Sequence, residues 1–125
     1  MPIHVFRDDS ARRLIVTVNG VMTTADTRAL MSQQMADGTW GYGVLYDLRR
    51  MTTSPSVDDL DGLKGLVDTL NKEVRRGPVA VVGLSIPEQV ARVDAYVERL
   101  KAAGVQIVRF DDLVKAEEWL IAQET

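Results

Sequence analysis

Three short apolar segments, each followed by an amphipathic stretch, constrain the fold of this chain more than any other feature. The segments lie at 44–49, 79–84 and 105–110, and each is rich in Val, Leu or Ile. The stretches between and after them repeat apolar residues three or four positions apart, which predicts helices. Strands that alternate with helices pair in parallel through right-handed crossovers. The sequence therefore predicts an α/β fold with a mostly parallel sheet.

Two further strands are predicted at the beginning of the chain. Residues 3–7 and 13–19 alternate or are β-branched, and the polar turn 8–10 separates them. Such a short turn favours an antiparallel hairpin. A helix at about 24–36 follows, so the complete order is ββαβαβαβα: a five-stranded mixed sheet, about four helices, and the first strand antiparallel at an edge. A length of 125 residues predicts one domain over 1–125.

The predicted helix starts carry capping boxes, in which a hydroxyl residue is followed three positions later by an acid. The pairs are Thr23 with Asp26, Ser56 with Asp59 and Ser85 with Glu88. The second helix is expected over about 57–75, because Arg75-Arg76-Gly77 combines cations and a glycine, as helix C-termini prefer.

Composition excludes several functions. The chain has no cysteine, one histidine (His4) and a net charge of −3. Disulfides, thiolate metal sites and thiol catalysis are therefore excluded, and the charge argues against nucleic-acid binding. The apolar runs are too short to span a membrane, and the N-terminus lacks an export pattern, so we expect a cytoplasmic protein without a metal or cofactor.

The polar segment that follows the strand at 44–49 is the predicted site, because ligands bind at the carboxyl ends of strands in open α/β sheets. Asp47 and Arg49 share one strand face and should form an ion pair. Two interpretations remain open: the pair only ties down the loop, or it lines a surface for a partner protein or an anion, beside the helix starts near Ser56 and Ser85. The candidate residues are Asp47, Arg49, Arg50, Thr52, Thr53, Ser54, Ser56 and Ser85.

No catalytic motif is found, so we do not expect an enzyme. The run 62–65 lacks the phosphate-loop pattern, and no serine sits in a nucleophile elbow. Asp8-Asp9 together with Asp47 resembles the acidic residues of a phospho-accepting receiver domain. However, a strand follows Asp9 directly, and the last strand ends in Arg109-Phe110 without the lysine that a receiver requires.

The chain as a whole resembles the SpoIIAA-like proteins, which are related to the STAS anti-sigma-factor antagonists. The resemblance rests on the segments 14–20, 45–49, 77–82 and 108–112, with Ala116, Trp119 and Leu120. It implies a non-enzymatic regulatory or protein-interaction domain. In the antagonists a phosphorylatable serine follows the central strand. Arg49 occupies that position here, and Ser54 and Ser56 are the nearby hydroxyls that would have to substitute.

The same resemblance implies a second class of function, because SpoIIAA-like proteins share architectural features with lipid-binding domains. A small apolar or anionic ligand is therefore the alternative partner. Four methionines would suit an adaptable apolar pocket, although simple core packing is the favoured explanation for them: Met22, Met31, Met35 and Met51. An unpaired edge strand would also support a homodimer.

Overall fold

The computed structural model describes residues 3–53, 56–72, 74–83 and 87–123 and contains one five-stranded sheet. The strands are β1 (Ile3–Asp8), β2 (Arg13–Val21), β3 (Gly43–Thr53), β4 (Val79–Val82) and β5 (Ile107–Phe110). They lie side by side in chain order. Only β1 is antiparallel to its neighbour, and the other pairs are parallel. The predicted α/β class, strand order and edge hairpin are confirmed.

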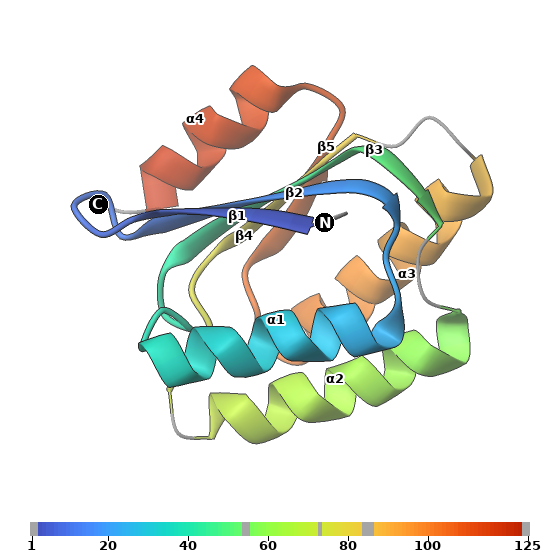
Figure 1. The fold of residues 1–125 in the computed structure, drawn as a ribbon, viewed down its shortest axis with the longest axis horizontal. Coiled ribbons are helices and arrows are strands. Elements are labelled where there is room, and N and C mark those ends of the chain that lie inside the picture. Colours follow the sequence, from blue (N-terminus) through green and yellow to red (C-terminus); the bar gives the residue numbers. More distant parts are fainter. Residues whose placement is uncertain (1–2, 54–55, 73, 84–86, 124–125) are drawn as a thin grey trace.

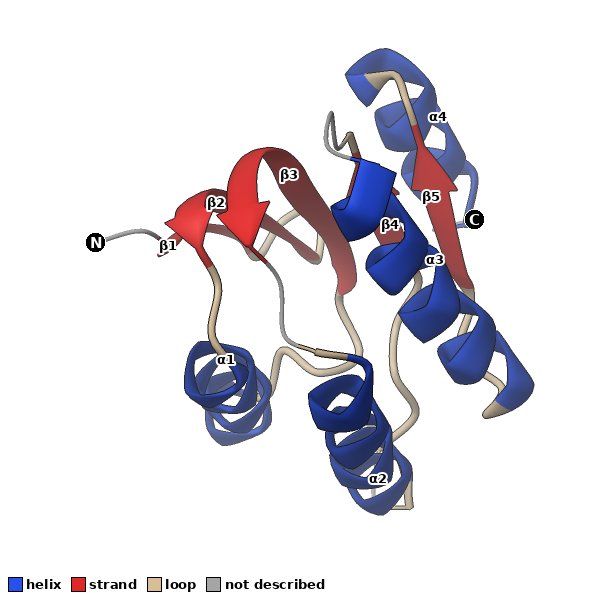
Figure 2. Cartoon of the chain, turned by 90° about the vertical axis from the view of Figure 1, so that its right-hand side faces the viewer, coloured by secondary structure: helices blue, strands red, loops and turns tan. Residues whose placement is uncertain are grey.

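Four helices cover the two faces of this sheet. α1 (Thr24–Asp37), α2 (Val57–Asn71) and α3 (Pro87–Ala102) each connect two parallel strands. Because sequential right-handed crossovers run in one direction, all three lie on the same face, and α4 (Leu113–Gln123) lies alone on the other (Figures 1 and 2). Each face has its own apolar cluster. Leu14, Val16 and Val44 belong to the larger one, and Leu45, Ala80 and Leu120 to the smaller.

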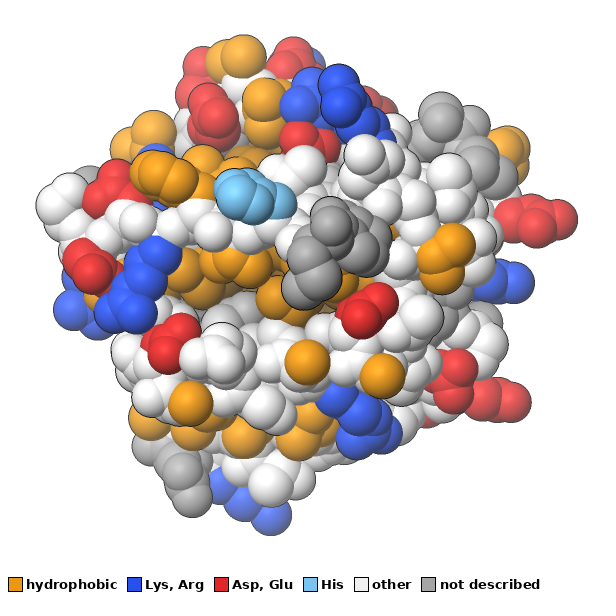
Figure 3. Space-filling view, in the orientation of Figure 1, with side chains coloured by type: hydrophobic (Ala, Val, Ile, Leu, Met, Phe, Trp, Pro, Cys, Tyr) orange, Lys and Arg blue, Asp and Glu red, His pale blue; other side chains and the backbone are white. Residues whose placement is uncertain are grey.

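The edge strand β1 exposes two apolar side chains. Val5 is 44% and Phe6 is 56% exposed, and apolar side chains flank the single histidine on this edge (Figure 3). The predicted homodimer therefore has an available edge and stays a prediction. Within the described part of the chain, no helix is long and apolar enough to cross a membrane.

The caps fix where the helices start. Thr23 and Asp26 form the predicted capping box, since the Thr23 hydroxyl accepts from the Asp26 N–H and the Asp26 carboxylate from the Thr23 N–H. Ser56 caps α2 by accepting from the Asp59 N–H at 3.2 Å. The third predicted box begins at Ser85, which lies outside the described residues.

The predicted end of α2 is wrong. The helix ends at Asn71 rather than near Arg75. The Asn71 side chain accepts hydrogen bonds from the Trp40 indole N–H at 3.1 Å and from the Arg76 backbone N–H at 2.8 Å. These bonds turn the chain inward after α2. As a result Arg76 becomes buried instead of forming a solvated helix end.

Candidate functional site

β3 continues beyond the predicted strand end at Arg49, and its register with β2 shifts twice there, between Thr17 and Asn19 and again between Gly20 and Val21. Between Thr17 and Asn19 β2 advances two residues while β3 advances three, from Asp47 to Arg50. This β-bulge presents two successive side chains on one side of the strand. Leu48 before it and Met51 after it are both buried, and Arg49 and Arg50 between them are both exposed. The segment expected to be a loop from Met51 onward is therefore strand as far as Thr53.

The predicted ion pair between Asp47 and Arg49 is present. Arg49 Nε donates to Asp47 Oδ1 at 2.9 Å and Arg49 Nη2 donates to Oδ2 at 2.8 Å, which is the two-pronged geometry that guanidinium and carboxylate prefer. The Arg49 backbone N–H also donates to Oδ1, at 3.2 Å. These hydrogen bonds hold the pKa of Asp47 below its ordinary value and raise the pKa of Arg49. The guanidinium is thus fixed in place while its side chain stays 52% exposed.

Gly83 provides the space beneath Arg49. It follows β4 with φ of +73°, a conformation that L side chains rarely adopt. A Cβ atom at this position would lie only 2.4 Å from Arg49 Cγ. The Gly83 N–H donates to Phe110 O at 2.9 Å, so the backbone of this turn is also tied to β5. Glycine is therefore required here both by backbone conformation and by the position of Arg49.

The remaining predicted residues are divided between three situations. Arg50, Thr52 and Thr53 are exposed along the end of β3. Ser56 is exposed but serves as the cap of α2. Ser54 and Ser85 lie outside the described residues, so the predicted anion site between the two helix starts remains a prediction. We call the described strand residues the β3 end surface: Asp47, Arg49, Arg50, Thr52 and Thr53.

The acidic residues of the receiver comparison do not converge. Asp8 pairs in register with Arg13, and Arg13 pairs with Gly43 at the start of β3. Asp47 lies four residues further along β3, which is about 13 Å at the usual rise of a strand. Asp9 instead accepts a hydrogen bond from the Tyr42 hydroxyl at 2.7 Å. Among the described residues no group of three or more Asp, Glu, His or Cys is placed to hold a metal ion.

A second feature lies beneath β3, between the sheet and helices α1 to α3. This core cavity has a volume of about 90 Å³. Its walls are mainly aliphatic and include three of the four methionines that the sequence suggested for a pocket, Met22, Met31 and Met51. The fourth, Met35, packs against the core elsewhere. Ligand pockets for drug-sized molecules are usually several hundred Å³, so this space suits a much smaller occupant.

A buried arginine borders the core cavity. Arg76 is 8% exposed, and its guanidinium carbon lies 4.2 Å from the centre of the Trp40 ring. Its Nη1 donates to Gln34 Oε1 and, at 3.3 Å, to Trp40 O, and its Nη2 donates to the Tyr46 hydroxyl at 3.3 Å. Burial lowers the pKa of Arg76 and raises the pKa of Tyr96, which lines the same cavity.

Sequence reasoning missed this group. Arg75-Arg76-Gly77 reads like any solvated helix end, and nothing in the run distinguishes the buried arginine from the exposed one. The sequence offers only a weak signal for this burial. Trp40 and Asn71 lie far apart in the chain, and the hydrogen bond between them can be recognised only once the fold is known.

Comparison with known proteins identifies the architecture. No family model matches the sequence, and the search of curated proteins finds no match. Among solved structures, the anti-sigma factor antagonist SpoIIAA in its unphosphorylated form is similar with a TM-score of 0.55 and 10% identity, covering 94% of this chain and 96% of that one. An uncharacterised DUF3478-family protein from Shewanella loihica PV-4 with a SpoIIAA-like fold gives 0.57 and 19%, covering 94% and 91%. The chain therefore has the SpoIIAA/STAS-like fold that its sequence resembles.

Proposed function

We propose that this chain is a non-enzymatic cytoplasmic regulatory domain that binds a partner protein through the β3 end surface. The observation that carries the proposal is the exposed arginine pair at the bulge. Arg49 and Arg50 are neighbours on one side of the strand, and Asp47 holds Arg49 in a fixed orientation. Arginine is enriched in protein interfaces, where a pre-ordered side chain loses less entropy on binding.

The fold supports the same proposal. SpoIIAA is an anti-sigma factor antagonist, and its structure covers nearly the whole of this chain. The strand that carries the arginines pairs with β4 as far as Asp47, and beyond that point it still pairs with β2, through Arg50, Met51 and Thr53. A surface on such a strand is rigid, whereas one on a free loop has to be ordered when the partner binds.

The charges on and beside the β3 end surface predict the charge of the partner's binding surface. The arginine pair is followed by Asp58 and Asp59 in the first turn of α2. The Arg49 charge is already compensated by Asp47. We therefore expect a partner surface of mixed charge, with a carboxylate opposite Arg50.

Capture from the native host with quantitative mass spectrometry tests the proposal. The double variant Arg49→Glu/Arg50→Glu should lose one specific protein that the wild type retains. A matched control is Lys72→Glu/Arg75→Glu, which makes the same charge change on exposed residues at the other end of the strands. The recovered protein should then bind purified wild type directly and the first variant at least tenfold more weakly. Equal binding by both double variants would refute the role of the arginine pair.

A further inference from the structure

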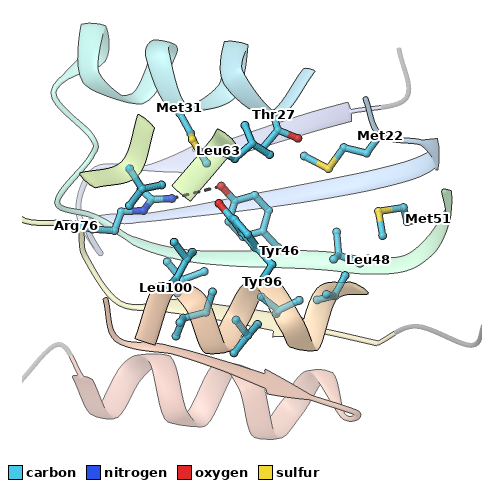
Figure 4. Close-up of a pocket in the computed structure, with 16 residues that line it drawn as sticks. Met22, Thr27, Met31, Tyr46, Leu48, Met51, Leu63, Arg76, Tyr96 and Leu100 are labelled. Atoms are coloured by element: carbon cyan, nitrogen blue, oxygen red, sulfur yellow. Dashed lines mark hydrogen bonds between the residues drawn. The ribbon is translucent and has the colours of Figure 1, made fainter. Parts of the chain in front are cut away.

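The core cavity is elongated and chemically different at its two ends. Arg76 and the hydroxyl groups of Tyr46 and Tyr96 lie toward one end, whereas Met22 and Met51 lie at the other (Figure 4). Arg76 precedes β4 and Met51 is near the carboxyl end of β3, so the long direction follows the strands. The cavity therefore has a polar, cationic end and an apolar end.

Within the described part of the chain, the cationic end has no anionic partner. All three side-chain hydrogen bonds of Arg76 that the described residues provide go to neutral groups: an amide, a backbone carbonyl and a phenol. No carboxylate of a described residue lies within ion-pair distance of it. A buried charge without a counter-charge is strongly unfavourable, and stacking on Trp40 offsets only part of that cost. A bound anion would supply the counter-charge that Arg76 does not receive from the described residues.

Two hydroxyl groups point to the place where that charge would lie. The Tyr96 hydroxyl is buried and has no hydrogen-bond partner among the described residues, although a buried hydroxyl normally has one. The Tyr46 hydroxyl accepts its bond from Arg76, which leaves its own proton free to donate. In Figure 4 both hydroxyls point toward Arg76. A guanidinium edge and two O–H donors therefore converge beside an apolar channel.

The geometry points to a binding site for a small carboxylic acid with a short apolar chain. The carboxylate pairs with Arg76 and accepts hydrogen bonds from Tyr46 and Tyr96, and the alkyl chain extends between Leu48 and the methionines. This site lies on the face of the sheet that α1, α2 and α3 cover. It is independent of the β3 end surface, and neither proposal needs the other.

Size and charge select this ligand class. An apolar cavity of about 150 Å³ can hold benzene, so 90 Å³ suits roughly four non-hydrogen atoms before any rearrangement. The flexible side chains of Met22 and Met51 can move to admit a few more. One buried cation matches one negative charge and the two oxygens of a carboxylate. A phosphate group would bring more charge and more acceptors than these donors satisfy.

Methyl NMR of the methionines reports directly on the cavity. Titration of the full chain with acetate, butyrate, hexanoate and dodecanoate should shift the Met22, Met31 and Met51 methyl signals in a saturable way. Butyrate or hexanoate should bind most tightly. The Met35 signal should stay in place, because Met35 does not line the cavity. Hexanamide has nearly the same shape without the charge and should bind at least tenfold more weakly.

Two variants test the polar end. Tyr96→Phe removes only the unpartnered hydroxyl, and the loss of one hydrogen bond to a charged group should weaken hexanoate binding about tenfold. Arg76→Gln should abolish saturable binding, with Arg75→Gln at the exposed neighbouring position as the control that retains it. If Arg76→Gln does not fold, Tyr96→Phe decides alone.

Three results would overturn the assignment. The first is the absence of saturable methyl shifts with any acid of the series. The second is equal affinity for hexanamide and hexanoate, which would show that Arg76 contributes no charge recognition. The third is unchanged affinity in Tyr96→Phe, which would place the acid elsewhere.

Discussion

Arg49 and Arg76 show two opposite environments for the same side chain. Arg49 is half exposed and forms a two-pronged pair with Asp47, so its charge is both hydrated and compensated. Arg76 is buried and bonded to neutral groups. An exposed ion pair adds little to the free energy of unfolding, whereas a buried charge lowers it unless a counter-charge and hydrogen bonds compensate. Among the described residues, Asp47 compensates the charge of Arg49 and no carboxylate compensates that of Arg76, which is why we assign a ligand to Arg76.

The largest expected effect comes from Arg76→Ala. The substitution leaves the acceptors on Gln34, Trp40 and Tyr46 without their donor and enlarges the cavity. These losses should exceed the gain from removing a buried charge, so the free energy of unfolding should fall by about 3 kcal/mol. Arg49→Ala should lower it by less than about 1 kcal/mol. Urea unfolding of both variants measures the difference. Similar losses would mean that burial does not distinguish the two arginines.

Gly83→Ala should have the next largest effect, a loss of about 2 kcal/mol. Its φ is +73° and its new Cβ would collide with Arg49. Gly38→Ala is the matched control, since Gly38 has the same φ and open space around it. That variant should lose only the backbone contribution, about 1 kcal/mol. Thermal unfolding compares them, and equal losses would show that Arg49 moves aside freely.

Tyr96→Phe should change stability in the opposite direction. Removing a buried hydroxyl that has no partner should raise the free energy of unfolding of the ligand-free protein by about 1 kcal/mol. Tyr46→Phe removes a hydroxyl that accepts from Arg76 and should lower it. Urea unfolding of the two purified variants checks the signs. A destabilised Tyr96→Phe would indicate that the hydroxyl already has a partner.

Asp47→Asn should have the smallest effect, and it should depend on pH. The pKa of Asp47 is lower in the folded protein than the ordinary 3.8, so its contribution is present above about pH 4 and is lost as pH falls through the folded value. Wild type and variant should differ by less than about 1 kcal/mol at about pH 7. Urea unfolding at about pH 3 should bring them closer together. A constant difference would mean that the Asp47 charge is irrelevant.

The fold was predictable because its determinants are local. Capping residues such as Thr23 and Ser56 bind the helix turns that follow them, and the alternation of strands and helices leaves few topologies. The ion pair of Asp47 and Arg49 was predictable for the same reason, since both lie on one short strand. Of the four methionines that the sequence suggested for a pocket, three line the core cavity, and Met35 packs elsewhere because residue type alone does not fix its position.

The rest depends on contacts between distant segments. The burial of Arg76 follows from the bonds of Asn71 to Trp40 and to the Arg76 backbone, which exist only after α2 has packed. The bulge depends on how β2 pairs with β3, and a single extra residue leaves no trace in the sequence of either strand. The residues of the β3 end surface were expected to continue into a loop, but they lie on the strand as far as Thr53.

The bulge in β3 also determines how substitutions in this strand will be tolerated. Near the start of β3, Val44 and Leu45 are both buried, in the apolar clusters on opposite faces of the sheet, so a scan of substitutions should show sensitivity at consecutive positions. After Leu48 the next inward position is Met51, three residues later. Two neighbouring positions, 49 and 50, should therefore both accept polar residues. An alignment that assumes strict alternation from Leu48 would place Arg50 inside and Met51 outside, the reverse of what the structure shows.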